Sequence, residues 1–201
     1  FLSTTDDSEN QCNFLLNLAV SHRAAQRFVE AERLYLQCLE MSRRLIGLEH
    51  ADTLKCMNSL AVTYRELKKF DLSEPLFLQV IEISRRVIGE NHTDTQAACV
   101  GLANCYRDQG RFSDAEPLYL SSLEFARRTK GFSHPETLDS LANLASLNGD
   151  IAAHERDRAR YVAAEKMYAE AIRTGTETLG RDHPLVVRWQ SNFDIDMQAK
   201  Q

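Results

Sequence analysis

Arginines with the geometry to bind carboxylates recur through the sequence at a constant interval. Arg23, Arg65 and Arg107 stand 42 residues apart, and we call them the arginine ladder. A guanidinium group binds a carboxylate through two parallel hydrogen bonds. If the three residues lie on neighbouring helices about 10 Å apart, an extended peptide that advances about 3.3 Å per residue could present a carboxylate to each arginine. This spacing predicts recognition of an acidic, extended peptide.

A second set of residues leaves an alternative open. Glu66, Asp108 and Asp150 form a parallel acidic series with the same 42-residue spacing. Glu66 and Asp108 directly follow an arginine of the ladder, and Asp150 directly follows the equivalent position of the fourth repeat. These carboxylates could pair with the arginines of the adjacent repeat, which would make the ladder structural and leave a neutral surface. The sequence supports both interpretations equally.

Histidine and cysteine could ligate a metal, but their spacing argues against it. His50, His92, His134 and His183 occupy equivalent repeat positions, which in stacked helices lie about 10 Å apart, whereas metal–nitrogen bonds are about 2.0–2.1 Å. We expect these histidines to cap helix starts. The cysteines form no CxxC pair and are expected to be buried, apolar and reduced, which indicates a cytoplasmic compartment; they are Cys12, Cys38, Cys56, Cys99 and Cys105.

Several function classes find no support in the sequence. There is no phosphate-binding glycine loop, no GxSxG and no HExxH, so we expect neither an enzyme nor a cofactor. The net charge of −5 lacks the basic character of nucleic-acid binders. No apolar run approaches the roughly 20 residues that span a membrane. The first residue is Phe1 rather than Met, and we expect the 201 residues to be a segment of a longer protein.

The elements that carry these residues repeat. Leu-Ala pairs recur every 42 residues at Leu18, Leu60, Leu102 and Leu144, and each of the first three is followed by an aromatic residue, a glutamate and a glycine at fixed offsets. In the fourth repeat seven residues are inserted, which gives a charged segment near 148–160 that could be a solvated loop or a helical extension. The predicted units are about 8–49, 50–91, 92–133 and 134–182, with 183–201 as a C-terminal capping helix in one domain, 1–201.

Each unit is expected to contain two helices. In the third unit, helix A covers about 93–109 and ends at Gly110, because glycine tolerates the left-handed conformation after a helix. Helix B is expected to open at Ser113 and Glu116 as a capping box, with Asp71 and Glu74 as its counterpart in the second unit. One hairpin cannot bury its apolar face alone, but stacked hairpins can. We therefore predict an all-α, right-handed superhelical solenoid of antiparallel helix pairs.

The order of residues in each unit resembles the tetratricopeptide repeat (TPR). The third unit shows it as Leu102-Ala103-x-x-Tyr106, then Gly110, Phe112 and Ala115-x-x-x-Tyr119. The 42-residue period and the Gly-x-x-His junctions are similar to those of kinesin light chains. In that family, asparagines of a Leu-Asn-Asn-Leu-Ala segment line the groove. Here Asn58 fills the first asparagine position, whereas Val100 and Ala142 replace it in later units.

The resemblance implies a concave groove, formed by the A helices, that binds a protein or an extended peptide. Fifteen residues occupy groove positions by their place in helix A: Asn13, Leu16, Val20, Arg23, Lys55, Asn58, Val62, Arg65, Ala97, Val100, Asn104 and Arg107, with Asp139, Ala142 and Ser146 in the fourth unit. We expect a protein-binding scaffold, with no nucleic-acid or membrane partner.

Two other function classes remain open. The chain could be a structural module that self-associates through residues 1–5 or through the terminal helix. It could also be the sensor or adaptor arm of a larger signalling protein, either a kinesin-light-chain-like cargo adaptor or a repeat-bearing ATPase. The charged insertion near 148–160 could contact a partner, since loops often carry function.

Overall fold

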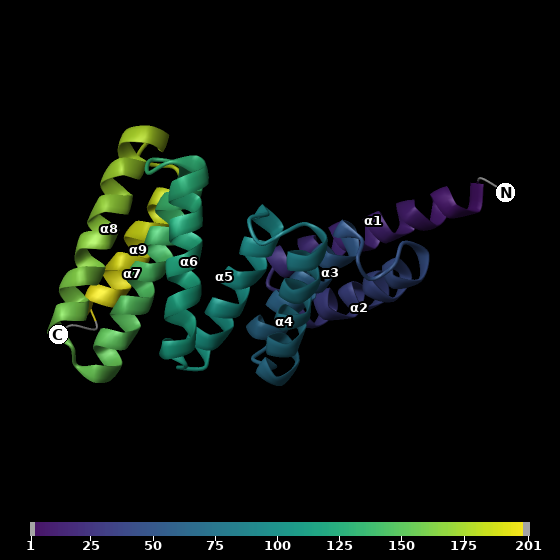
Figure 1. Cartoon of the computed structure of the whole chain (residues 1–201), viewed down its shortest axis with the longest axis horizontal. Helices are drawn as coiled ribbons and strands as arrows, with labels where there is room; N and C mark the ends of the chain where they lie inside the picture. The colour runs from purple at the N-terminus through teal and green to yellow at the C-terminus, as the bar shows by residue number, and fades with distance from the viewer. Residues whose placement is uncertain (1–2, 199–201) are drawn as a thin grey trace. The chain divides into compact units, whose positions relative to one another are not determined.

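The fold is entirely helical over the part of the chain that is described. The computed structural model describes the backbone of residues 3–198 and the side chains of residues 10–198. Within that range there are nine helices and no strand, as Figure 1 shows. They are α1 Ser3–Ala24, α2 Phe28–Leu45, α3 Ala51–Glu66, α4 Phe70–Val87, α5 Thr93–Asp108, α6 Phe112–Lys130, α7 Pro135–Glu155, α8 Arg158–Leu179 and α9 Pro184–Gln198. The predicted all-α class is confirmed.

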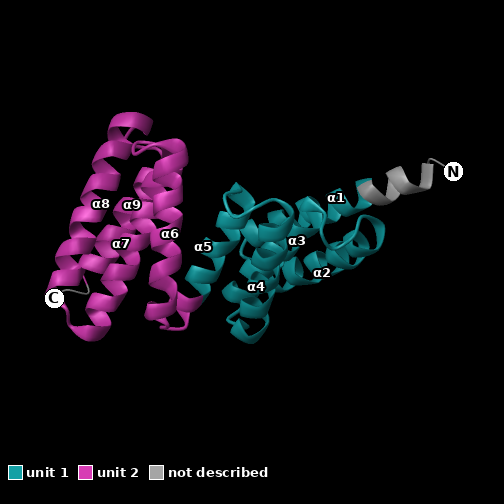
Figure 2. Cartoon of the chain, viewed as in Figure 1, with its two compact units in different colours: residues 1–105 teal, residues 106–201 magenta. Residues whose placement is uncertain are grey.

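The helices form two compact units, residues 1–105 and 106–201, which Figure 2 shows in two colours. In the first unit α1 packs on α2, α2 on α3 and α3 on α4. In the second unit α6 packs on α7 and α7 on α8, and α9 packs on both α7 and α8. Helices adjacent in sequence are therefore adjacent in space, as a TPR-like solenoid of helix pairs requires. The prediction of one domain over 1–201 stays a prediction.

Close packing of helix A on helix B depends on one small and one aromatic position. The alanine of each Leu-Ala pair has no exposed surface; the four are Ala19, Ala61, Ala103 and Ala145. The aromatic residue of each B helix is at most 1% exposed; the four are Tyr35, Phe77, Tyr119 and Tyr168. In the second repeat the Ser73 hydroxyl on α4 donates to the Ala61 carbonyl oxygen on α3 at 2.8 Å. Such proximity is possible only because alanine has no bulk beyond its methyl group.

The junctions between units confirm the predicted histidine caps. His50 Nδ1 accepts a hydrogen bond from the backbone N–H of Asp52 at 3.2 Å, and His92, His134 and His183 make the equivalent bond. The Thr53 hydroxyl then donates to the carbonyl oxygen of Gly47 at 2.7 Å, which ties the start of helix A to the preceding turn. Gly47 has φ of +89°, a conformation that favours glycine. These bonds satisfy backbone groups that a helix end leaves free.

The predicted capping boxes are wrong. The B helices begin at Phe70 and Phe112, one residue before the predicted caps Asp71 and Ser113, and their observed caps Lys69 and Arg111 make no side-chain cap bond. Ser73 lies inside the first turn, where it is buried and bonds to helix A instead. The turn after helix A is short, so helix B begins directly at the aromatic residue, Phe70 or Phe112. A Ser-x-x-Glu pattern within the first turn therefore resembles a capping box without acting as one.

The insertion near 148–160 is a helical extension rather than a solvated loop. Helix α7 continues to Glu155, and Ile151 and Ala152 in its added turns are buried. Asp157 then caps α8 by accepting hydrogen bonds from the N–H groups of Ala159 and Arg160 at 2.8 and 3.3 Å. The buried aliphatic residues explain the outcome, because they pack only if the helix continues.

The last helix packs on both α7 and α8. Trp189 is 1% exposed and its Nε1–H donates to Asp139 Oδ1 on α7 at 2.8 Å. The ring of Phe193 packs edge-to-face on Tyr168 with 5.8 Å between centroids. Asp194, which stands where the other A helices have alanine, is exposed, and so are the apolar side chains of Val187 and Ile195. The prediction of a C-terminal capping helix over 183–201 stays a prediction.

The arginine pairs at the ends of the B helices have local partners. Arg86 Nη2 lies 2.8 Å from Glu49 Oε1, Arg85 pairs with Glu90, and Arg127 stacks over the Phe132 ring at 5.5 Å. All three stand in the last turn of their helix, where positive charge complements the helix dipole.

Within the described residues, no helix has an apolar stretch long enough to cross a bilayer.

Gly101 provides a test of the packing. A Cβ at this position of α5 would lie 2.4 Å from Cε1 of Phe77 on α4. We expect Gly101→Ala to destabilise the fold by up to about 2 kcal/mol, because an overpacking cost of about 1–3 kcal/mol is offset by a helix-propensity gain of only about 1 kcal/mol. Urea unfolding followed by circular dichroism measures the change. In a Phe77→Leu background the same substitution should cost less, and a stabilising effect in the wild-type background would contradict the packing.

Candidate peptide-binding surface

The predicted groove residues of the first unit lie on the A helices α1 and α3 and on α5 up to residue 105. On α1 and α3, the side chains of Asn13, Val20 and Lys55 are exposed. The others in this unit are partly buried: Leu16, Arg23, Asn58, Val62, Arg65, Val100 and Asn104. This mixture of half-buried aliphatic and polar side chains is typical of a surface that can still bury area on binding. Arg107 belongs to the second unit and is described there.

Oδ1 of Asn58 on α3 and Nε of Arg23 on α1 are buried on this surface without a hydrogen bond. Nε of Arg65 is buried in the same way, but it belongs to a guanidinium group that pairs with Glu66. The guanidinium of Arg23 forms no ion pair or hydrogen bond with any described residue, and Nδ1 of the adjacent His22 is likewise buried and unbonded. A buried polar group without a partner costs about 1–3 kcal/mol. A ligand that supplies a carboxylate to Arg23 and an N–H to Asn58 would recover that free energy.

Arg65 is engaged within its own helix. Its guanidinium forms an ion pair with the carboxylate of Glu66, the next residue on α3. The acidic residue predicted to neutralise an arginine does so here, but from the same helix rather than from an adjacent repeat. The positive charge of Arg65 is therefore partly compensated before any ligand binds.

Arg107 is engaged by the following A helix of the second unit. Its Nε–H donates to Asp150 Oδ2 on α7, and both side chains are about one third exposed or less, 27% and 34%. Burial alone would lower the pKa of Arg107, but the Asp150 carboxylate more than offsets that effect and raises it. For this member of the ladder, the alternative that acidic residues of the next repeat neutralise the arginines is confirmed.

A second carboxylate joins this pair from α9. The Tyr168 hydroxyl on α8 donates to Asp196 Oδ2 at 2.8 Å. Burial raises the pKa of the Asp196 carboxyl, and the nearby Asp150 carboxylate raises it further, while Arg107 acts in the opposite direction. Gly149 makes room for Asp196, because a Cβ on it would lie 3.0 Å from the carboxyl carbon. The end of α5 that belongs to the second unit thus shares one polar cluster around Arg107 with α7, α8 and α9.

The three groove positions predicted in the fourth repeat are not open. Asp139 accepts hydrogen bonds from Trp189 and Arg188 of α9, and Ala142 and Ser146 are 2% and 4% exposed. The reason is that α9 packs on α7, a contact that the repeat pattern of helix A alone does not reveal. In the second unit these positions hold the capping helix in place.

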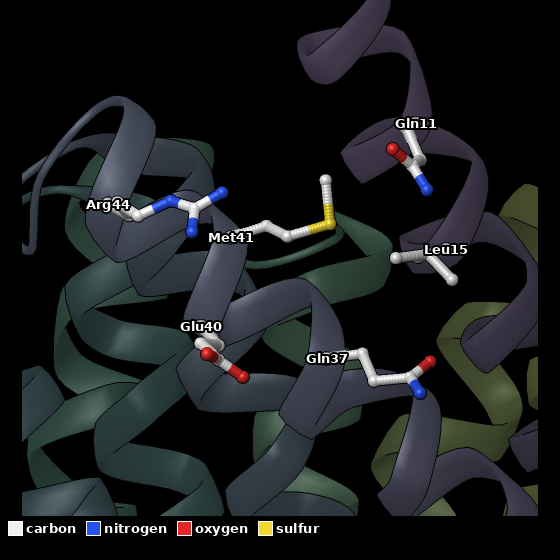
Figure 3. A pocket seen from close by; sticks show the side chains of 6 residues that line it. All are labelled: Gln11, Leu15, Gln37, Glu40, Met41 and Arg44. Carbon is white, nitrogen blue, oxygen red and sulfur yellow. The ribbon is translucent and has the colours of Figure 1, made fainter.

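Two cavities that the sequence did not indicate lie at the surface. One, of about 320 Å³, opens between α1 and α2 and is lined by Leu15, Met41, Arg44, Glu40, Gln11 and Gln37, as Figure 3 shows. The other, of about 970 Å³, lies along α8 and α9 beside Val187 and Ile195, which are 53% and 62% exposed. The repeat contains a sign of the cavity between α1 and α2. Leu15, which lines this cavity, aligns with Met57 and Cys99, and both of those residues are buried in their units.

Comparison with known proteins identifies the repeat. Tetratricopeptide repeat profiles match residues 10–86, 60–128 and 94–151, and a second tetratricopeptide repeat profile matches 137–185. The chain belongs to the tetratricopeptide repeat family. TPR proteins generally mediate protein–protein interactions, and TPR arrays are typically scaffolds rather than enzymes.

Solved structures confirm the TPR fold and its likeness to kinesin light chains. The nearly identical TPR-like repeats assigned to a kinesin light chain of Podosopora anserina superpose with a TM-score of 0.72 at 21% identity, covering 94% of this chain and 86% of that one. BtubC (BKLC) from P. vanneervenii gives a TM-score of 0.72 at 18% identity, covering 98% and 80%. No curated protein matches the sequence significantly. At these identities the likeness establishes the TPR fold.

The role of Arg107 can be tested by its removal. We expect Arg107→Ala to destabilise the protein by about 1–3 kcal/mol, because Asp150 and Asp196 would then be left partly buried without their cation. The matched control is Arg85→Ala, whose exposed pair with Glu90 should contribute about 0–1 kcal/mol. Urea unfolding of both variants measures the difference. Equal effects would show that the Arg107 cluster is not structural.

The raised pKa of Asp196 predicts a specific dependence on pH. A carboxyl whose pKa is raised by folding stabilises the fold below its unfolded pKa, and this contribution is lost as the pH rises through the folded pKa. Asp196→Asn stays neutral and should lack this contribution. The stability of the wild type relative to Asp196→Asn should therefore increase as the pH falls from 7 towards 4. A difference that is constant over that range, measured by urea unfolding, would contradict the assignment.

Proposed function

We propose that this TPR array is a protein-binding scaffold and that the A helices of residues 10–105 contact an extended segment of the partner. One observation carries the proposal: Arg23 and Asn58 present buried polar atoms without hydrogen bonds on the surface that the sequence predicts as the groove. Half-buried Leu16 and Val62 lie on the same helices and offer apolar area beside them.

The two groups suit different parts of a peptide. The side-chain oxygen of Asn58 can accept a backbone N–H, which gives affinity that is independent of sequence. The guanidinium of Arg23 can bind a carboxylate in a bidentate manner, and the exposed ammonium group of Lys55 adds positive charge on α3. The partner segment is therefore extended and carries an acidic side chain at the position that meets Arg23.

The ion pairs of the other two arginines refine the acidic-peptide proposal. Arg65 already pairs with Glu66, and Arg107 pairs with Asp150. A carboxylate at either position would compete with one that is already bound, whereas a carboxylate at Arg23 has no competitor among the described residues. We therefore propose one acidic contact at Arg23 in place of an acidic residue at every third position.

Selection of peptides from a display library with the wild-type chain as target tests the proposal. We expect enrichment of extended sequences that contain Asp or Glu. Arg23→Glu should weaken binding of the selected peptides at least tenfold by fluorescence polarisation, which corresponds to about 1.4 kcal/mol, and Asn58→Ala should weaken it less. Arg43→Glu, an equal charge change at an exposed position of α2, is the control. Loss of binding in Arg43→Glu as well, or no loss in Arg23→Glu, would refute the assigned surface.

Self-association is a second candidate because α8 and α9 leave apolar residues uncovered. Val187 and Ile195 border the cavity of about 970 Å³ and are more than half exposed. The alternative contact through residues 1–5 involves side chains outside the described residues. Mass measured by light scattering should rise with concentration if the chain self-associates through α9, and Ile195→Lys should abolish that rise.

A further inference from the structure

Three cysteines gather where α1, α2 and α3 meet, although they are far apart in the sequence. Sγ of Cys12 on α1 lies 3.3 Å from Sγ of Cys38 on α2 and 2.9 Å from the Ser42 hydroxyl oxygen. Cys56 on α3 is directed to the same region, and its thiol donates to the Tyr35 carbonyl oxygen of α2 at 3.4 Å. The proposed binding surface uses none of these sulfur atoms.

We propose that Cys12 and Cys38 are a redox modification site, which a hydroperoxide converts into a reversible disulfide that joins α1 to α2. The proposal does not depend on the proposed binding function. It rests on the sulfur–sulfur distance, on the difference in exposure between the two thiols and on the cavity beside Cys12.

The geometry needs little rearrangement. A disulfide bond is about 2.03–2.05 Å long, so the two sulfur atoms, now 3.3 Å apart, must approach by about 1 Å. The sulfur of each cysteine also lies within 3.7 Å of the carbonyl oxygen of the other, which shows that the two backbones are already close. Side-chain rotation with a small helix shift is sufficient to form the bond.

Access is confined to one of the thiols. Cys12 is half-buried and lines a cavity of about 80 Å³ together with Ser42, His50 and Asp52. Cys38 is 1% exposed and Cys56 has no exposed surface. A cavity holds a water molecule once its volume in this measure exceeds about 10–15 Å³, so a hydroperoxide of two oxygen atoms fits such a space. The oxidant therefore meets Cys12 first, and Cys38 is placed behind it as the resolving thiol.

Neighbouring polar side chains favour the charged form of Cys38. Cys56 has the largest effect and, with Cys12 and Ser42, lowers the pKa of Cys38 to about 6 against the effect of burial. Burial raises the pKa of Cys12. The nearby Cys38 sulfur, and burial, raise the pKa of Cys56. Cys38 is therefore the more acidic thiol of the Cys12–Cys38 pair.

The reaction balances in two steps. The Cys12 sulfur attacks one oxygen of hydrogen peroxide while its proton passes to the Cys38 thiolate; the O–O bond breaks, and hydroxide leaves. Cys12 is then a sulfenic acid. The Cys38 sulfur attacks the Cys12 sulfur, the S–O bond breaks, and the departing hydroxide takes the Cys38 proton to form water. Each sulfur supplies one of the two electrons that reduce the peroxide, and a thiol reductant reverses the change by exchange.

The disulfide would restrain the helix that supplies the first groove residues. Asn13 adjoins Cys12 and lines the same cavity, and α1 also carries Leu16, Val20 and Arg23. A covalent bond between residues 26 apart in sequence reduces the conformational freedom of the unfolded chain. Oxidation should therefore stabilise the first hairpin and hold α1 against α2.

The experiment treats the full chain with hydrogen peroxide, alkylates the remaining thiols and maps tryptic peptides by mass spectrometry without reduction. Lysines and arginines separate the three cysteines, so each possible disulfide gives a different linked mass. We expect the Cys12–Cys38 peptide pair, its loss on addition of a thiol reductant, and a rise in Tm of about 5 °C for the oxidised protein.

Cys12→Ser should abolish both the linked pair and the rise in Tm, whereas Cys99→Ser, which changes a buried thiol of α5, should leave both unchanged. Circular dichroism of Cys12→Ser checks that the variant is folded. A Cys38–Cys56 pair in the wild type, a link between two chains, or irreversible oxidation without a disulfide would overturn the proposal. The readout is a peptide mass, so failure of the peptide-binding proposal would not affect it.

Discussion

Burial of a small residue on helix A and of a large aromatic residue on helix B recurs in every repeat and underlies the repeat geometry. Ala19, Ala61, Ala103 and Ala145 are fully covered, and each is followed 16 to 23 residues later by a buried aromatic residue of its B helix. Small side chains let packed helices approach closely, and large rings fill the interior around them. The 42-residue period keeps these positions, the histidine caps and the groove residues in register along the chain.

Burial of each A helix also requires the preceding hairpin. Cys56 and Ala98 have no exposed surface in their units, whereas Phe14, at the equivalent position of α1, is 65% exposed. Cys56 is buried because α2 covers it, and its thiol donates a hydrogen bond to the backbone of α2. The uncovered side of α1 and α2 is where the cavity of Figure 3 opens. The same dependence on neighbours brings Cys12 and Cys38 together, because the first hairpin places helix positions 26 residues apart in contact.

The second unit uses groove positions for structure. Arg107, Asp150, Tyr168 and Asp196 come from four helices and satisfy one another, and Asp139 holds Trp189. An exposed arginine would remain available to a ligand, but this one is committed once α7 and α9 are packed. The proposed ligand contacts therefore lie on α1 and α3, where Arg23 and Asn58 keep unbonded atoms. Equivalent positions in a repeat thus have different roles, according to which neighbours pack on them.

The sequence by itself determined the helical class, the repeat and the histidine caps, because each depends on periodicity or on residues a few positions apart. It suggested capping boxes at Asp71 and Ser113 that do not form, since a local pattern does not show at which residue the preceding turn ends. The sequence did not decide whether the insertion near 148–160 is a loop or a helical extension, and the burial of Ile151 in the structure decides for the helix. Only the tertiary structure decided that Arg107 pairs with a carboxylate 43 residues away and that two thiols meet. The pairing of groups distant in sequence is fixed by how whole helices stack, and one-residue shifts in that stacking change every such contact.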